Sequence, residues 1–249
     1  IFRAAEPETE ATVWIFAAYD PSGWSMTVRI YFEEREMDQI KNLVFDLGDV
    51  LIQFRWRDFL RNLGVKEEDV ERVGAEMFDD PKHLWHEFDL GNLSAQQAAK
   101  ELGEEYPEDA EVISWFILHG EYMPLPRLRV WEMVHLLKLQ GYRIYVLSNY
   151  PEELFHKHTQ YADFMQDLDG RVISYEVHMG KPELPIYREL LARYQLIPQE
   201  CLFFDDRKEN ILGARACGMY GRQVFSQEGL LEDLEKIHQG RVEEVLRTD

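Results

Sequence analysis

Polar residues suited to acid–base and phosphate chemistry follow apolar stretches at three places in this chain. Asp46 lies in LVFDLGDVL, Ser148 and Asn149 lie in RIYVLSNYPEE, and Asp205 and Asp206 lie in CLFFDDRKENILGARACGM. The carboxyl ends of parallel strands meet at one edge of a sheet, so such residues converge there in the fold. A carboxylate can attack as a nucleophile, and carboxylate oxygens also hold divalent cations. The pattern therefore predicts one reaction site.

Two further residues extend this pattern. Lys181 in MGKPELPIY lies at an expected helix entrance, and Asn210 lies one turn into the helix that follows Asp205 and Asp206. Taken singly, each patch has a structural explanation as a strand-end acid, a helix cap, a surface lysine or a solvated turn. The occurrence of all four patches in this order favours a catalytic interpretation.

The elements that must position these residues alternate between strand and helix. Most of the apolar runs are separated by amphipathic stretches such as 128–140. This alternation predicts an α/β fold, a three-layer Rossmann-like core with a parallel sheet. The expected strands are 43–45, 143–147, 172–175, 201–204 and 222–225.

A long segment separates the first expected strand from the second. It carries helical patterns at 56–62, 67–78 and 94–102, with Ser94 as an N-cap, and it exceeds an ordinary connection. We therefore expect a helical cap domain at 55–125, placed over the carboxyl edge of the sheet. The catalytic core then comprises 37–54 and 126–249, with an amphipathic helix over 229–249.

The first 36 residues differ from the rest of the chain. They contain scattered Trp and a Pro-Ser-Gly turn without a sustained helical period, although 27–32 alternates as a strand would. The chain does not begin with Met, whereas Met37 opens a stretch typical of the start of a compact enzyme. We expect 1–36 to be an accessory or spurious extension.

The charge of the chain restricts its partners. With 27 Lys and Arg against 47 Asp and Glu, the formal charge is −20. An acidic surface repels phosphate, so it cannot collect the counterion-release energy that drives nucleic-acid binding. A divalent cation held by carboxylates would overcome that repulsion locally. We expect no nucleic acid as a partner, and any phosphorylated ligand would require such a cation.

Cysteine usage and hydropathy indicate the compartment. Cys201 and Cys217 lack metal-ligand spacing, which is typical of a reducing cytoplasm. The apolar runs are too short to cross a bilayer, and no secretory signal is visible. We expect a cytoplasmic monomer or homodimer without a membrane partner.

The four patches resemble the motifs of the haloacid dehalogenase-like (HAD) hydrolases. FDLGDVL is similar to motif one, VLSN to motif two, GKPELPIY to motif three and FFDDRKENILGA to motif four, and the resemblance covers residues 37 to about 225. Within the superfamily the chain resembles the helical-cap branch that includes α-D-glucose-1-phosphate phosphatase. The resemblance implies a phosphatase that requires Mg2+ and acts through an aspartyl-phosphate.

The resemblance also implies roles for individual residues. Asp46 would be the nucleophile, and Ser148 with the Asn149 N–H would hold phosphoryl oxygens. Lys181 would neutralise charge on the nucleophile and on the transferring group. Asn210 would fix the motif-four loop. The implied Mg2+ ligands are Asp46, the Gly48 carbonyl and Asp206, with Asp205 as a ligand or an orienting residue.

One position departs from the pattern. Most phosphatases of this superfamily carry an acid–base Asp two residues after the nucleophile, where this chain has Gly48, a residue expected to let the chain turn sharply. Losing a general acid–base typically costs about 10² to 10⁴ in rate. Three explanations remain open: Asp49 substitutes, a cap residue such as His86 or Asp89 reaches in, or the substrate has a good leaving group.

An anomeric sugar phosphate such as glucose 1-phosphate has such a leaving group, so sugar phosphates are the expected substrates. We expect His86 and Asp89 to contact substrate. The rivals are a 2-haloacid dehalogenase, which needs no metal, and a non-catalytic regulatory or binding protein of the same fold. A phosphomutase is disfavoured because it calls for an acid–base at the position of Gly48.

Overall fold

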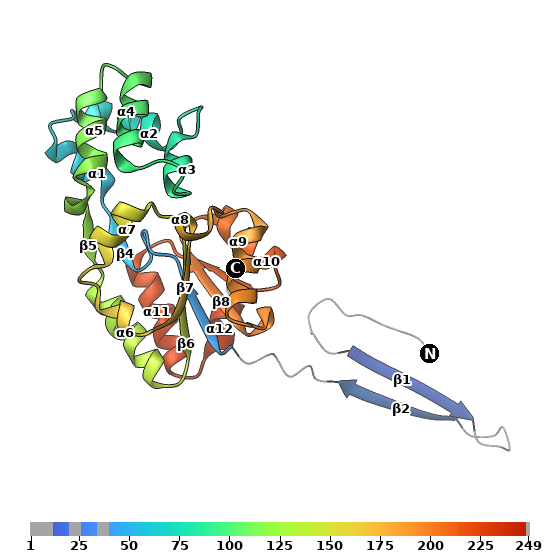
Figure 1. Cartoon of the computed structure of the whole chain (residues 1–249). Helices are drawn as coiled ribbons and strands as arrows, with labels where there is room; N and C mark the ends of the chain where they lie inside the picture. The colour runs from blue at the N-terminus through green and yellow to red at the C-terminus, as the bar shows by residue number, and fades with distance from the viewer. Residues whose placement is uncertain (1–11, 20–25, 34–39, 248–249) are drawn as a thin grey trace. The chain divides into compact units, whose positions relative to one another are not determined.

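The computed structural model describes residues 12–19, 26–33 and 40–247, and the chain divides into two compact units, Ile1–Gln39 and Ile40–Asp249. In the first unit β2 (Met26–Glu33) pairs antiparallel with β1 (Thr12–Tyr19) (Figure 1). The strand expected at 27–32 is present, whereas β1 had not been predicted. The expected domain start at Met37 lies outside the described residues, and the accessory or spurious nature of 1–36 stays a prediction.

The second unit is built around a five-stranded sheet in the order β7-β6-β3-β8-β9. Every neighbouring pair in it is parallel, which confirms the predicted α/β fold. The central strand β3 has the sequence NLVF, and all four of its residues are buried. The strands are β3 (Asn42–Phe45), β6 (Arg143–Ser148), β7 (Leu168–Ile173), β8 (Cys201–Asp205) and β9 (Tyr220–Gln223).

Alternation along the strands creates the two outer layers, because successive side chains point to opposite faces. Val44 and Phe203 pack in one buried cluster with α9 (Leu184–Arg193) and α10 (Lys208–Ala216). On the other face Phe45 and Phe204 stack at 5.2 Å between ring centroids. That face is covered by α6 (Leu128–Leu139) and α11 (Gln227–His238).

A group of helices follows β3 and lies beyond one end of the sheet (Figure 1). The chain enters this group through β4 (Ile52–Phe54) and leaves it through β5 (Pro124–Pro126), and these two strands pair antiparallel. The Ser94 N-cap is confirmed, since its Oγ accepts a hydrogen bond from the Gln97 N–H. The helices are α1 (Trp56–Asn62), α2 (Val70–Phe78), α3 (Leu84–Asp89), α4 (Ala95–Glu105) and α5 (Ala110–Leu118).

An aromatic cluster holds these helices together. The Phe78 ring makes edge-to-face contacts with Trp85 at 4.7 Å, with Trp56 at 5.3 Å and with Phe116 at 6.1 Å between centroids. Such pairs add to the stabilisation from burial. The boundaries 37–54, 55–125 and 126–249 that were assigned to core and cap stay predictions.

Two strand predictions were displaced. The strand expected at 172–175 is β7, and it ends at Ile173 because α8 (Ser174–Val177) begins there. The strand expected at 222–225 is β9, which ends at Gln223, and Phe225 is 86% exposed. In both strands polar residues and a glycine interrupt the apolar pattern that was used to place them.

The carboxyl-terminal prediction also needs correction. The expected single helix over 229–249 is two helices, α11 and α12 (Val242–Leu246), because Gly240 adopts a left-handed φ of 75° between them. The remaining core helix, α7 (Glu152–Thr159), follows β6. Among the described residues no helix is long and apolar enough to cross a membrane.

Candidate active site

Asp46 lies where β3 ends, at the centre of the sheet edge that faces the helical group. Its backbone N–H donates to the Phe204 carbonyl at 2.9 Å, which ties it to the neighbouring strand. Its Oδ1 accepts hydrogen bonds from the Leu47 N–H at 2.8 Å and the Ser148 hydroxyl at 2.6 Å. The Lys181 ammonium lies 2.9 Å from the same oxygen. Oδ2 accepts no hydrogen bond from the residues that the structure describes.

The left-handed residue in the turn after Asp46 is Asp49 and not Gly48. We expected Gly48 to permit a sharp turn, but the left-handed residue is Asp49, with a φ of 52°. The Asp49 Oδ1 accepts a hydrogen bond from the Phe54 N–H at 3.0 Å, which stabilises this conformation. A Cβ added at position 48 would meet no atom within 4 Å, so the space for a Cβ does not by itself require glycine there.

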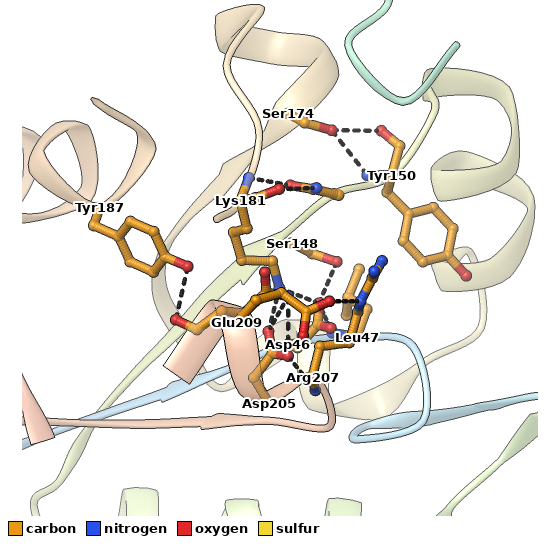
Figure 2. Close-up of polar contacts among 12 residues, drawn as sticks. Asp46, Leu47, Ser148, Tyr150, Ser174, Lys181, Tyr187, Asp205, Arg207 and Glu209 are labelled. Atoms are coloured by element: carbon orange, nitrogen blue, oxygen red, sulfur yellow. Dashed lines mark hydrogen bonds and ion pairs between the residues drawn. The ribbon is translucent and has the colours of Figure 1, made fainter. Parts of the chain in front are cut away.

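Lys181 is buried between two carboxylates. Its ammonium lies 2.6 Å from Asp205 Oδ2 as well as 2.9 Å from Asp46, and Figure 2 shows the side chain reaching both. Burial lowers the pKa of Lys181, but Asp205 and Asp46 outweigh that effect and raise the pKa above its usual value. The ammonium therefore stays charged and balances part of the buried negative charge.

Asn149 positions this lysine. Its side-chain amide donates to the Lys181 carbonyl at 2.9 Å and accepts from the Lys181 N–H at 2.8 Å. This reciprocal pair joins the end of β6 to the loop before α9, so two separate sequence motifs are held in one place. Asn149 also lines the cavity next to Asp46.

Asp205 and Asp206 follow each other in sequence but have different surroundings. Asp205 is fully buried, and its two oxygens accept from the Arg207 N–H, the Asn210 amide and Lys181 at 2.6–3.1 Å. The Asp206 carboxylate makes no hydrogen bond or ion pair with the described residues. Burial, with Asp46 and Asp205 adding repulsion, raises the pKa of Asp206 to about 7.

The three aspartates provide the donors that a hard cation prefers. One carboxylate oxygen from each of Asp46, Asp205 and Asp206 lies within 4.8 Å of the others. Burial raises the pKa of Asp46 to about 6, because Lys181 and Ser148 only partly compensate for desolvation and for the repulsion from Asp205. Oxygen-rich clusters with excess negative charge fit Mg2+. Because the Asp205 oxygens are already engaged, Asp46 and Asp206 are the carboxylates open to an ion.

A cavity of about 160 Å³ opens beside Asp46. Its polar lining includes Asp89 of α3. His86 lies against Gly180, since a Cβ added to Gly180 would be 3.1 Å from His86 Cε1. The apolar lining was not predicted from sequence, because such residues have the same pattern as ordinary core. That lining consists of Phe54, Trp85, Tyr150, Pro151 and Leu154.

Comparison with known proteins identifies the family. The family model described as haloacid dehalogenase-like hydrolase matches residues 40–218. The sesquiterpene phosphatase astK of Aspergillus oryzae is 25% identical over 73% of this chain and 88% of its own length. The drimenol cyclase drtB of Aspergillus calidoustus is 27% identical over 72% of this chain, which spans only 33% of that protein.

Solved structures agree with this assignment at the level of the fold. A predicted HAD-like family hydrolase from Porphyromonas gingivalis has a TM-score of 0.60 at 23% identity, covering 85% of this chain and 100% of its own. A HAD family enzyme from Bacteroides thetaiotaomicron, in complex with magnesium and inorganic phosphate, has a TM-score of 0.54 at 20% identity, covering 74% of this chain and 93% of its own. The chain therefore belongs to the haloacid dehalogenase-like hydrolases.

Proposed function

We propose that this hydrolase is a Mg2+-dependent phosphomonoesterase in which Asp46 is the nucleophile. One observation carries the proposal: Oδ1 of Asp46 is fixed by Leu47, Ser148 and Lys181, whereas Oδ2 has no donor among the described residues. A carboxylate held by one oxygen keeps the other oriented for attack on phosphorus. The presence of a named phosphatase among the relatives supports the same reaction class.

The chain's own groups would act as follows. Oδ2 of Asp46 attacks phosphorus as the bond from phosphorus to the ester oxygen breaks, which forms an aspartyl-phosphate and releases the alcohol. Water then attacks phosphorus, the bond to Asp46 breaks, and inorganic phosphate leaves. Lys181 offsets charge on Asp46 and on the phosphoryl group, while Ser148 keeps the Asp46 carboxylate in place and, with the Asn149 N–H, contacts phosphoryl oxygens. Asp205 holds Lys181 and Asn210 in position.

Mg2+ would be held by Asp46, Asp206 and the Gly48 carbonyl, with Asp205 orienting the site from behind. When bound, the ion would neutralise carboxylate and phosphate charge that otherwise repel each other. The raised pKa values of Asp46 and Asp206 agree with this, since burial raises both and repulsion between the neighbouring carboxylates adds to the rise.

The substrate class has two candidates. A sugar phosphate stays the first, because its anomeric oxygen is a good leaving group and a cavity of about 160 Å³ suits a small ester. An ester of an apolar alcohol is the second, because Phe54, Trp85 and Leu154 line the cavity and a relative is named a sesquiterpene phosphatase. Ligand sites of roughly 300–1,000 Å³ are usual, so a long prenyl chain would have to extend beyond this cavity.

Phosphate release with p-nitrophenyl phosphate, glucose 1-phosphate, butyl phosphate and farnesyl phosphate tests the proposal. We expect turnover with Mg2+ that EDTA abolishes, no turnover by Asp46→Asn, and full turnover by the surface control Asp163→Asn. Turnover by Asp46→Asn would contradict the covalent mechanism. Halide release from 2-chloropropionate without Mg2+ would establish the dehalogenase instead, and no turnover of any kind would favour a regulatory protein.

A further inference from the structure

We propose that Asp89, a residue of the cap, is the general acid and base of this enzyme. The inference rests on the proposed phosphatase function and concerns the proton that Gly48 cannot supply. Asp89 is the last residue of α3, and it lines the same cavity as Asp46 and Asp206. Its carboxyl group makes no hydrogen bond or ion pair with the residues that the structure describes, so it is available to substrate.

The backbone around Asp89 is anchored to the core, which fixes where its side chain starts. The Asp89 carbonyl accepts a hydrogen bond from the Ser174 hydroxyl, and the Leu90 carbonyl is 2.8 Å from His178 Nδ1. The Ser174 hydroxyl also accepts from the Tyr150 N–H at 2.9 Å, a contact drawn in Figure 2. One hydroxyl therefore links the cap to the end of β6, beside the nucleophile.

Gly91 lets the cap approach the core this closely. Its φ is 72°, and a Cβ there would lie 3.1 Å from both the Cβ and the carbonyl oxygen of Tyr175. A larger residue would be strained and would push the segment away from α8. Together with the two backbone hydrogen bonds, this contact holds Asp89 over the cavity.

Asp49 and His86, the other two candidates for the general acid–base, are less well placed than Asp89 to reach a substrate. Asp49 also lines the cavity, and burial raises the pKa of its carboxyl group, but its Oδ1 already accepts from the Phe54 N–H and lies 3.8 Å from Arg127. His86 does not line the cavity and packs near Gly180. Asp89 is the candidate that both lines the cavity and has an unpaired carboxyl group among the described residues.

The charges that face Asp89 support a protonated resting form. Desolvation raises the pKa of Asp89 to about 8, Arg207 and Lys181 act in the opposite direction, and Asp46 adds to the rise. Asp206 faces the same cavity. At neutral pH the group is therefore a carboxylic acid that holds a proton to donate.

The proton balance of the two steps is as follows. As Asp46 Oδ2 forms its bond to phosphorus, the bond from phosphorus to the ester oxygen breaks and Asp89 gives that oxygen its proton, which releases the alcohol. In the second step the Asp89 carboxylate takes a proton from water as the water oxygen attacks phosphorus. The phosphorus bond to Asp46 then breaks, and phosphate leaves while Asp89 is again protonated.

Asp89→Asn tests the role, because it replaces a neutral acid with a neutral group of similar shape. We expect kcat/KM for butyl phosphate to fall about 10² to 10⁴-fold. 2,4-Dinitrophenyl phosphate needs no proton for its leaving group, so the variant should release a burst of dinitrophenol stoichiometric with enzyme and then turn over slowly. The control Glu87→Gln, on the same helix but outside the cavity lining, should behave as wild type, and thermal melting checks that all variants fold.

The outcomes separate the two proposals. If wild-type enzyme hydrolyses none of the esters, the phosphatase function fails and the role of Asp89 fails with it. If wild type is active but Asp89→Asn loses activity equally on both esters without a burst, or retains wild-type turnover of butyl phosphate, only the role of Asp89 is overturned. A leaving-group-dependent defect in Asp49→Asn instead would assign the proton transfer to that residue.

Discussion

The Lys181 ammonium lies 2.6 Å from Asp205 Oδ2 in the buried interior of the site. The same ammonium lies 2.9 Å from Asp46, so one cation serves two carboxylates while Asp206 has no partner among the described residues. The site thus has more buried negative than positive charge, and this imbalance is the physical basis for the cation proposed above.

Replacing Lys181 with Met should lower both stability and activity. The change leaves Asp46 and Asp205 buried without their cation, and breaking a buried pair in this way costs about 3–5 kcal/mol. Urea unfolding at neutral pH measures the loss. Adding Asp205→Asn should restore part of the stability but none of the activity, whereas wild-type stability in Lys181→Met would contradict the arrangement.

The two adjacent aspartates should respond differently to amidation. Asp206→Asn should weaken Mg2+ binding by at least tenfold without lowering the melting temperature measured in EDTA, since its carboxylate has no described partner. Asp205→Asn should instead lower the melting temperature, because its oxygens accept from Lys181, Asn210 and the Arg207 N–H. Calorimetric Mg2+ titration and thermal melting distinguish the two, and equal behaviour of the variants would be evidence against separate roles.

Stability without metal should depend on pH through Asp206. The pKa of Asp206 in the folded state is about 7, above the ordinary value of 3.8, so the folded state binds more protons than the unfolded state. The folded protein therefore loses stability through this group as pH rises from about 4 to 7. The pKa values of Asp46 and Asp89 are also raised, so these two groups likewise reduce the stability of the folded protein as pH rises. His158, whose pKa burial lowers to about 4, acts oppositely between pH 4 and 6.5.

A comparison of variants isolates the Asp206 contribution. In EDTA, Asp206→Asn should melt above wild type at pH 8, and the difference should shrink toward pH 5, where the wild-type group is protonated. Saturating Mg2+ should reverse the order at pH 8. A melting difference that is independent of pH would show that Asp206 ionises normally.

Gly213 should tolerate no side chain, because α10 packs directly on the loop that carries Lys181. An added Cβ would lie 2.8 Å from the Pro182 carbonyl oxygen and 2.8 Å from the Tyr187 ring. Gly213→Ala should cost about 1–3 kcal/mol and reduce turnover by moving Lys181. Gly229→Ala, whose Cβ would meet only Ser226 Oγ at 3.4 Å, is the matched control and should be neutral or slightly stabilising in chemical denaturation.

The sequence predicted the parts of the site that strand order determines. Asp46 directly follows β3, Ser148 ends β6 and Asp205 ends β8. These three parallel strands are neighbours, so the convergence of the three residues follows from topology. The limits of β7 and β9 were misplaced because their polar residues weaken the apolar pattern. The role of Gly48 in the turn was misjudged, since the left-handed conformation fell one residue later, at Asp49.

The side of the site that α3 contributes could not be predicted because it depends on tertiary docking. The hydrogen bond from Ser174 to the Asp89 carbonyl joins residues far apart in the chain, and no local pattern indicates it. Likewise Trp85 and Phe54 line the cavity, although singly each has the pattern of a core residue. The sequence offered a few candidates for the general acid–base, and only the contacts of the folded chain distinguish among them.

Trapping the covalent intermediate tests the central claim most directly. Enzyme mixed with 2,4-dinitrophenyl phosphate and Mg2+ is quenched in acid, digested and examined by mass spectrometry for a phosphoryl group on the peptide that contains Asp46. We expect one phosphoryl group on Asp46, accumulating further in Asp89→Asn and absent in Asp46→Asn. Steady turnover with no phosphorylated Asp46 at any quench time in either wild type or Asp89→Asn would contradict the nucleophilic role of this residue.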